Sequence, residues 1–182
     1  MTFTATSSSW NKQMLYYRGN DEKRYTEIPP IPEGTTHLDV CFNPELTELP
    51  PLPEGLINLD CSATGLSSLV LPESLLEFSC SYSKFKSLPA LPAGLTDLVC
   101  GYNRELAELP PLPKGLRVLM IDYTAMTVIP RLPETLRVFL ATGAPLAEPF
   151  ATYNAEYRKE LRINVLIDQV NAYWDKLALT PV

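Results

Sequence analysis

Five stretches of this chain read almost alike: IPPIP at 28–32, LPPLP at 49–53, LPALP at 88–92, LPPLP at 109–113 and IPRLP at 129–133. A sixth copy, LVLP at 69–72, is one residue shorter. We call each copy a proline phrase. The second apolar residue of each phrase stands at 31, 52, 71, 91, 112 or 132, so the copies recur every 19 to 21 residues. The chain is therefore built from small repeated units.

A second pattern follows each proline phrase and has the form L-x-x-L-x-(C/I/V)-x-x-(N/T)-x-L. Its clearest copy runs from Leu56 to Leu66, and the other copies start at 35, 75, 95, 116 and 136. Fixed leucine positions at a period near 20 are typical of a leucine-rich repeat solenoid. Leu59 and Cys61 alternate with Asp60, which predicts a short half-buried strand. Stacked copies predict an α/β fold with about six repeats and a parallel sheet on the concave face.

The proline phrases are predicted to form the convex return path. Proline lacks an N–H group and fixes φ, so it is excluded from central strands and helix interiors. Two or three prolines in five residues favour an extended, polyproline-like path. We expect an N-terminal tail and cap over 1–27, the solenoid over 28–148 and a helical cap over 149–182.

The repeat resembles one known class. Leu-Pro-x-Leu-Pro followed by Leu-x-x-Leu at a period of 20 is similar to the "LPX" leucine-rich repeats of secreted bacterial effectors of the YopM and IpaH kind. The resemblance covers about 28–148 and implies a curved sheet that binds host proteins. Some members carry a ubiquitin-ligase domain with a Cys-x-Asp motif. No cysteine here stands in that motif, and 34 residues after the repeats are too few for such a domain.

The amino-acid composition argues against two classes of binding partner. The formal net charge of −6 argues against nucleic acid and anionic membranes, which both select basic surfaces. No apolar run is long enough for a membrane span, and no signal peptide is visible at the start. We expect a cytoplasmic chain, or one that is secreted into a host cell by a route independent of a signal peptide.

Three of the four cysteines are predicted to be core thiols. Cys61, Cys80 and Cys100 share one repeat position, which Val40, Ile121 and Ala141 occupy in other copies. A position that accepts these residues is a small apolar core site. Spacings of 19 and 20 with a single histidine do not fit a zinc site. Cys41 stands one place further along, so we expect it to face outward or to sit at the end of the strand, where it would be the reactive thiol.

Residues between the repeated positions form the candidate binding surface. Strand residues that point away from the core are acidic and polar in the first repeats and apolar in the later ones. Three tyrosines follow successive strands and form a ladder, either as binding anchors or as mutual packing. Asp39 and Asp60 share a ladder too, as a docking spot for a cation or a Lys/Arg side chain, or as a solvated acidic face. The predicted protein-binding residues are Asp39, Asp60, Tyr82, Val99, Tyr102, Met120, Tyr123 and Leu140.

Both ends are predicted to be caps, because a solenoid has apolar edges to cover. Asn154 is expected to start a helix that runs to about Leu177 and closes the last repeat. Its apolar face is predicted to hold Ile163, Leu166, Ile167, Val170, Tyr173, Trp174 and Leu177. This cap could also cover the apolar half of the concave face. At the other end, Trp10 and residues 14–17 are expected to cover the first repeat.

No catalytic arrangement, metal ligand set or cofactor motif is recognisable, and His37 has no evident nucleophile partner. The sequence therefore predicts a non-enzymatic protein–protein interaction module without a cofactor. Two alternatives stay open. One is a substrate-recognition adaptor for a ubiquitin-ligase system, and the other is a repeat protein that associates weakly with itself.

Overall fold

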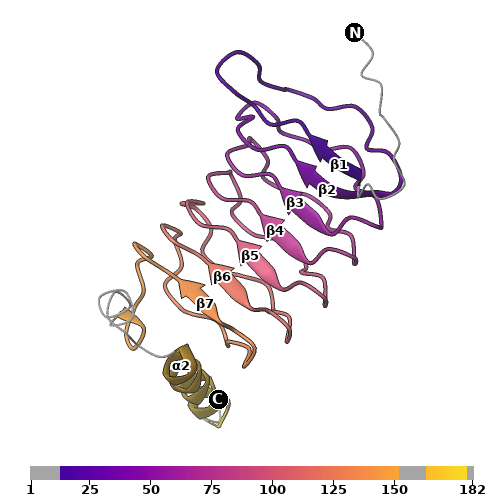
Figure 1. The fold of residues 1–182 in the computed structure, drawn as a ribbon. Helices are drawn as coiled ribbons and strands as arrows, with labels where there is room; N and C mark the ends of the chain where they lie inside the picture. The colour runs from indigo at the N-terminus through magenta and orange to yellow at the C-terminus, as the bar shows by residue number, and fades with distance from the viewer. Residues whose placement is uncertain (1–12, 152–162, 180–182) are drawn as a thin grey trace.

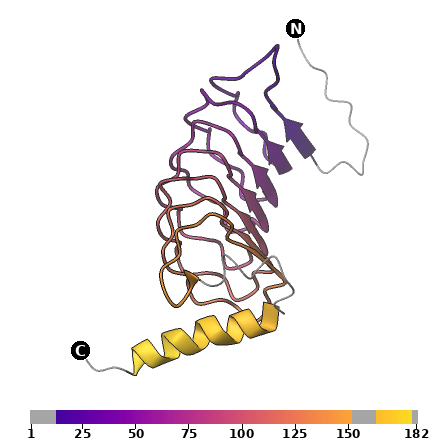
Figure 2. The same ribbon diagram turned by 90° about the vertical axis from the view of Figure 1, so that its left-hand side faces the viewer.

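The computed structural model describes residues 13–151 and 163–179, and it shows one sheet of seven parallel strands in chain order (Figure 1). The strands are β1 (Gln13–Tyr16), β2 (Thr35–Asp39), β3 (Asn58–Asp60), β4 (Glu77–Ser79), β5 (Asp97–Val99), β6 (Val118–Met120) and β7 (Val138–Leu140). The chain returns along the opposite side of the stack after each strand (Figures 1 and 2). The predicted leucine-rich repeat solenoid is confirmed.

Strands β3 to β7 have three residues each, and only the central one, a Leu or Phe, reaches the core. Leu38 occupies the same position in the longer β2, where Thr35 is buried as well. The pairing is in register, so that Leu59 lies between Leu38 and Phe78. Identical spacing therefore places equivalent residues side by side along the whole sheet.

The proline phrases form the return path, as predicted, and they contain neither helix nor strand. The last proline of each phrase begins a tight turn into the next strand. In all six copies its carbonyl accepts the N–H of the residue three places on, at 3.0–3.2 Å. Gly34 has a φ of 82° in the first of these turns, whereas the other copies make the turn without a left-handed residue. The proline phrase thus sets the geometry of strand entry.

A column of buried polar side chains joins the repeats behind the sheet. Asn103 donates from its amide nitrogen to the carbonyls of Cys80 and Cys100, at 2.9 Å each. Thr64 and Thr124 occupy the same repeat position and donate to the carbonyl three residues before. Buried carbonyls need such partners because unpaired polar groups are costly away from water. This explains the Asn/Thr position of the repeat.

Strand β1 was not predicted. It adds a seventh strand before the first repeat and pairs in parallel with β2, from Gln13–Thr35 to Tyr16–Asp39. Leu15 and Tyr17 pack against the core, but Met14 and Tyr16 are exposed. The expected cover over the first repeat is therefore a strand with one outward face, and Trp10 lies outside the described residues.

The C-terminal cap is the helix α2 (Ile163–Ala178), which crosses the end of the solenoid (Figure 2). Leu166, Ile167 and Val170 are buried against the last repeat. Its expected start at Asn154 lies outside the described residues. Leu177 was wrongly placed in the apolar face: it is 47% exposed, because the last turn of the helix passes beyond the core.

The helix docks on the last proline phrase. Asn171 exchanges two hydrogen bonds with the backbone of Leu132, at 2.9 and 3.0 Å, and the Trp174 indole donates to the carbonyl of Ile129. Val138 and Leu140 on β7 each remain 37% exposed. The described part of the cap therefore leaves the apolar half of the sheet open. Within the described ranges, no helix is both long and apolar enough to cross a bilayer.

Truncation of Leu166 to Ala should destabilise the chain by about 2–5 kcal/mol, because this fully buried side chain fills the space between the helix and the last repeat. The matched control is Leu177→Ala on the same helix, which should change stability by less than about 0.5 kcal/mol. Urea denaturation followed by circular dichroism measures both. Equal effects of the two variants would contradict the docking described above.

Candidate functional site

One position in each repeat has an unusual backbone. It is the third residue after each strand, and we call the six copies the turn column: Phe42, Ala63, Tyr82, Tyr102, Tyr123 and Gly143. All six have positive φ, between 53° and 70°. Left-handed backbone is uncommon for residues other than Gly, Asn and Asp and is strained for bulky ones. Four aromatic residues therefore stand where the backbone favours small ones.

The ladder of backbone hydrogen bonds holds this strained conformation in place. Each non-glycine member of the column donates its N–H to a carbonyl in the next repeat, as from Tyr102 to Asp122 and from Tyr123 to Thr142. These bonds extend the pairing of the sheet three residues beyond the strands. Strained residues persist where the surrounding structure over-determines them, and they gather at functional sites.

The three tyrosines of the column stack on one another. The ring centroids are 4.0 Å apart for Tyr82 and Tyr102, and 4.7 Å apart for Tyr102 and Tyr123. A side-chain hydrogen bond with Tyr82 raises the pKa of the Tyr102 phenol. The outer members keep large exposed surfaces, 59% for Tyr82 and 42% for Tyr123. The structure brings these predicted residues together, and it shows the mutual packing that the sequence left open.

The predicted apolar residues lie on the last three strands. Val99 and Met120 are register partners on β5 and β6, and Leu140 follows on β7. Val99 and Met120 are half-buried, whereas Leu140 is exposed. Together with Val118 and Val138, they form a continuous apolar area on the outward face of the sheet, beside the tyrosine stack. Exposed apolar area of this kind is typical of interaction surfaces.

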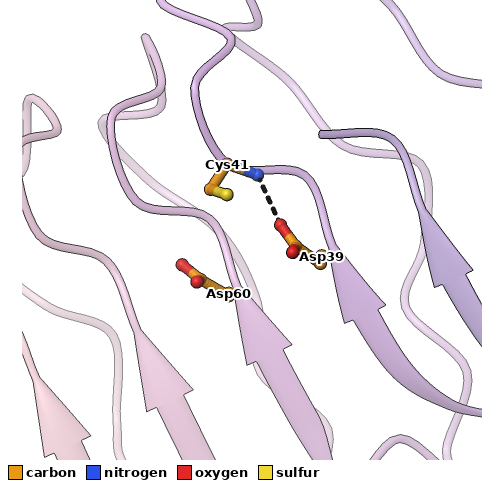
Figure 3. Close-up of side chains that lie close together, drawn as sticks. All are labelled: Asp39, Cys41 and Asp60. Atoms are coloured by element: carbon orange, nitrogen blue, oxygen red, sulfur yellow. Dashed lines mark hydrogen bonds between the residues drawn. The ribbon is translucent and has the colours of Figure 1, made fainter. Parts of the chain in front are cut away.

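The predicted acidic residues lie at the other end of the sheet (Figure 3). Asp39 on β2 and Asp60 on β3 are register partners. Each carboxylate accepts the backbone N–H two residues on: Asp39 from Cys41 at 3.0 Å, and Asp60 from Ser62 at 2.9 Å. Arg18 approaches Asp39 at 3.9 Å. The two predicted groups of site residues therefore occupy opposite ends of one surface.

The expectation that Cys41 is the reactive thiol is wrong, because the residue is buried although it lies beside the carboxylates of Asp39 and Asp60 (Figure 3). Its side chain is only 1% exposed, since the chain from Tyr17 to Gly19 runs alongside it and Gly19 donates its N–H to the carbonyl of Cys41. Burial and the neighbouring Asp39 and Asp60 carboxylates raise the pKa of this thiol to about 12. A protonated, buried thiol is a poor nucleophile. Cys41 is therefore not the reactive thiol of the chain.

Asp39, Cys41 and Asp60 form the one group of potential cation ligands in the described residues, with one ligand atom from each within 4.8 Å of the others. Binding a metal through Cys41 would require a thiolate, which its raised pKa opposes. The carboxylates alone form an acidic surface at this end of the sheet. The group therefore does not suit a thiolate-bound metal.

The three cysteines of the core are placed as predicted. Cys61, Cys80 and Cys100 are fully buried next to the strands, and all four thiols of the chain are free. Burial raises the pKa of each of the three, to about 12 for Cys100. His37, the sole histidine, is half-buried beside the Thr36 hydroxyl.

Known proteins provide one informative comparison. No protein-family model and no curated protein sequence matches this chain. Among solved structures, YopM from Yersinia enterocolitica WA-314 is similar, with 38% identity over 62% of this chain and a TM-score of 0.59. The solenoid is therefore similar in fold to the leucine-rich repeats of YopM. The match covers 25% of the length of the YopM chain.

The likeness to YopM supports the resemblance drawn from the proline phrases. The sequence did not predict the left-handed backbone of the turn column. Its one signal is Gly143, which occupies the same repeat position as the tyrosines and favours positive φ. The other copies do not reveal this preference for positive φ, because four of them have an aromatic residue at the same position.

Stability should fall above pH 9 because the buried thiols must stay protonated in the folded chain. The folded pKa of Cys100, about 12, exceeds its ordinary value of 9.0. The stabilisation is therefore complete below pH 9 and is lost as the pH rises toward 12, by up to about 1.4 kcal/mol per pH unit for each thiol.

Urea denaturation of the wild type and of Cys100→Val between pH 7 and 10.5 tests this. Valine occupies the equivalent position in the first repeat, so the variant should fold. It should lose stability less steeply above pH 9 than the wild type. Identical pH slopes would show that Cys100 ionises equally in both states.

Proposed function

We propose that this chain is a non-enzymatic interaction module that binds a protein partner on the outward face of its sheet and on the turn column. The likeness to YopM supports an interaction scaffold of the effector kind. The resemblance to secreted effectors points to a host-cell protein as the partner and to delivery into the host cell. The residues that carry binding in this proposal are those predicted from the sequence.

One observation carries the proposal: strained backbone positions hold large aromatic side chains in four of six repeats, and three of these side chains are exposed. A left-handed bulky residue costs on the order of 1–3 kcal/mol, and glycine or asparagine would avoid most of that cost. Stacking recovers part of it, but the outer rings remain exposed to water. Tyrosine is enriched in binding surfaces because it offers area and a hydroxyl group at low entropic cost.

The surface also has the layout of a protein interface. Apolar side chains from β5 to β7 and the tyrosine stack provide area that a partner would bury. The acidic end around Asp39 and Asp60 provides charge that orients the partner. The net charge of −6 favours a partner with a basic or neutral surface.

Replacing Tyr102 and Met120 together by Ala should weaken capture of protein partners from a host-cell lysate by at least about tenfold without unfolding the chain, because both side chains lie at the centre of the proposed surface. Immobilised wild type and variant, compared by quantitative mass spectrometry of the proteins they retain, measure this.

The matched control replaces Val70 and Val128, two exposed apolar residues of the return path, by Ala. It should retain the same proteins as the wild type. If the Tyr102/Met120 variant also retains them at wild-type levels, the binding surface lies elsewhere.

A further inference from the structure

The turn column lacks a ring at one internal position, Ala63, besides Gly143 at its end. Counting along the sheet, it reads Phe42, Ala63, Tyr82, Tyr102 and Tyr123, so alanine separates Phe42 from the tyrosine stack. Phe42 and Tyr82 are 50% and 59% exposed. Two repeat spacings, or about 9–10 Å, separate these two positions. The surface above Ala63 is therefore flanked by two aromatic side chains.

The chain shows how a ring fills such a space. Tyr102 also lies between aromatic residues two repeats apart, Tyr82 and Tyr123, and its ring centroid is 4.0 and 4.7 Å from theirs. One planar group fits between side chains at this separation. The space above Ala63 has the same repeat geometry with a methyl group in place of the ring.

The first repeat shows which planar group fits this end of the surface. The Arg18 guanidinium lies over the Phe42 ring, with its central carbon 5.0 Å from the ring centroid, and it approaches the Asp39 carboxylate at 3.9 Å. Arginine combines a flat face, which stacks on aromatic rings, with a permanent positive charge. Arg18 comes from the chain that follows β1, on the side of Phe42 away from Ala63.

The second repeat presents the same acid beside Ala63. Asp60 is the register partner of Asp39, and each accepts the backbone N–H of the residue that precedes the turn-column position. Asp60 therefore has the same position relative to Ala63 as Asp39 has relative to Phe42. Among the described residues, Asp60 makes no ion pair within 4.0 Å, whereas Asp39 has Arg18.

We propose that the space above Ala63 binds an arginine side chain of the protein partner, with the guanidinium between Phe42 and Tyr82 and paired with Asp60. This inference rests on the proposed function and deepens it by naming the chemistry that the partner presents. Lysine lacks the flat face, and a neutral aromatic side chain leaves Asp60 without a positively charged partner.

A titration without the natural partner tests the site. N-acetyl-L-arginine N-methylamide is added to the isotope-labelled full chain, and the Ala63 methyl signal and the amides of Ser62 and Ser81 are followed by NMR. We expect saturable shifts with a dissociation constant on the order of 10–100 mM, as befits one stacked ion pair. The corresponding lysine amide and the uncharged citrulline amide should each bind at least about threefold more weakly.

Two variants test the geometry. Ala63→Tyr fills the space with the ring that its neighbours carry, so arginine-dependent shifts of Ser62 and Ser81 should weaken at least about tenfold. Asp60→Asn keeps the shape and removes the charge, so binding should weaken about threefold or more. Ala107→Tyr, on the exposed return path, is the matched control and should bind arginine as the wild type does.

Three results would overturn the proposal: no shift near Ala63 up to about 0.2 M arginine amide, equal binding of citrulline or of N-acetyl-phenylalanine amide, or arginine binding unchanged in both Ala63→Tyr and Asp60→Asn. These results leave the proposed function standing if the Tyr102/Met120 variant still loses its partners. Conversely, arginine binding at Ala63 with unaltered capture by that variant would overturn the placement of the main surface.

Discussion

The hydrogen-bonded register between neighbouring repeats is the constraint on which the rest of this structure depends. It begins at the short strands and continues through the turn column, where each backbone N–H reaches a carbonyl of the next repeat. Because the register is the same from β2 to β7, equivalent side chains form continuous columns along the molecule. One column holds leucine and phenylalanine, a second holds the core cysteines, a third holds asparagine and threonine, and a fourth holds the tyrosines. The residues that differ between repeats lie in the surface columns, where we propose that the partner binds.

The same register explains how strain is tolerated. A single left-handed tyrosine in an isolated turn would relax, but here its N–H is fixed to the next repeat and its ring is stacked on its neighbours. Buried amide and hydroxyl groups such as Asn103 and Thr124 hold the chain just after the turn. Backbone and side-chain hydrogen bonds therefore fix the chain where it presents the tyrosine stack. A preorganised surface loses little entropy on binding.

Sequence reasoning predicted the repeat, the sheet, the extended return path and the core cysteines, because each follows from a residue type recurring at a fixed spacing. It failed for features that are set by contacts that do not recur at the repeat spacing. Strand β1 has no copy of the leucine pattern, and its pairing with β2 buries Cys41, which the repeat alone predicted to be reactive. Leu177 has the right helical spacing, but the core ends before it. Positive φ at Tyr82 and its equivalents depends on contacts between repeats, which no local pattern encodes.

The central claim is that the tyrosines of the turn column serve binding rather than stability. It is tested most directly by the free energy of unfolding of a variant with Tyr82, Tyr102 and Tyr123 all replaced by Asn, measured by urea denaturation. Asparagine tolerates positive φ, so relief of strain should offset the lost stacking. The account predicts a stability within about 1 kcal/mol of the wild type. A loss of more than about 3 kcal/mol would show that the stack is a structural element and would contradict the account.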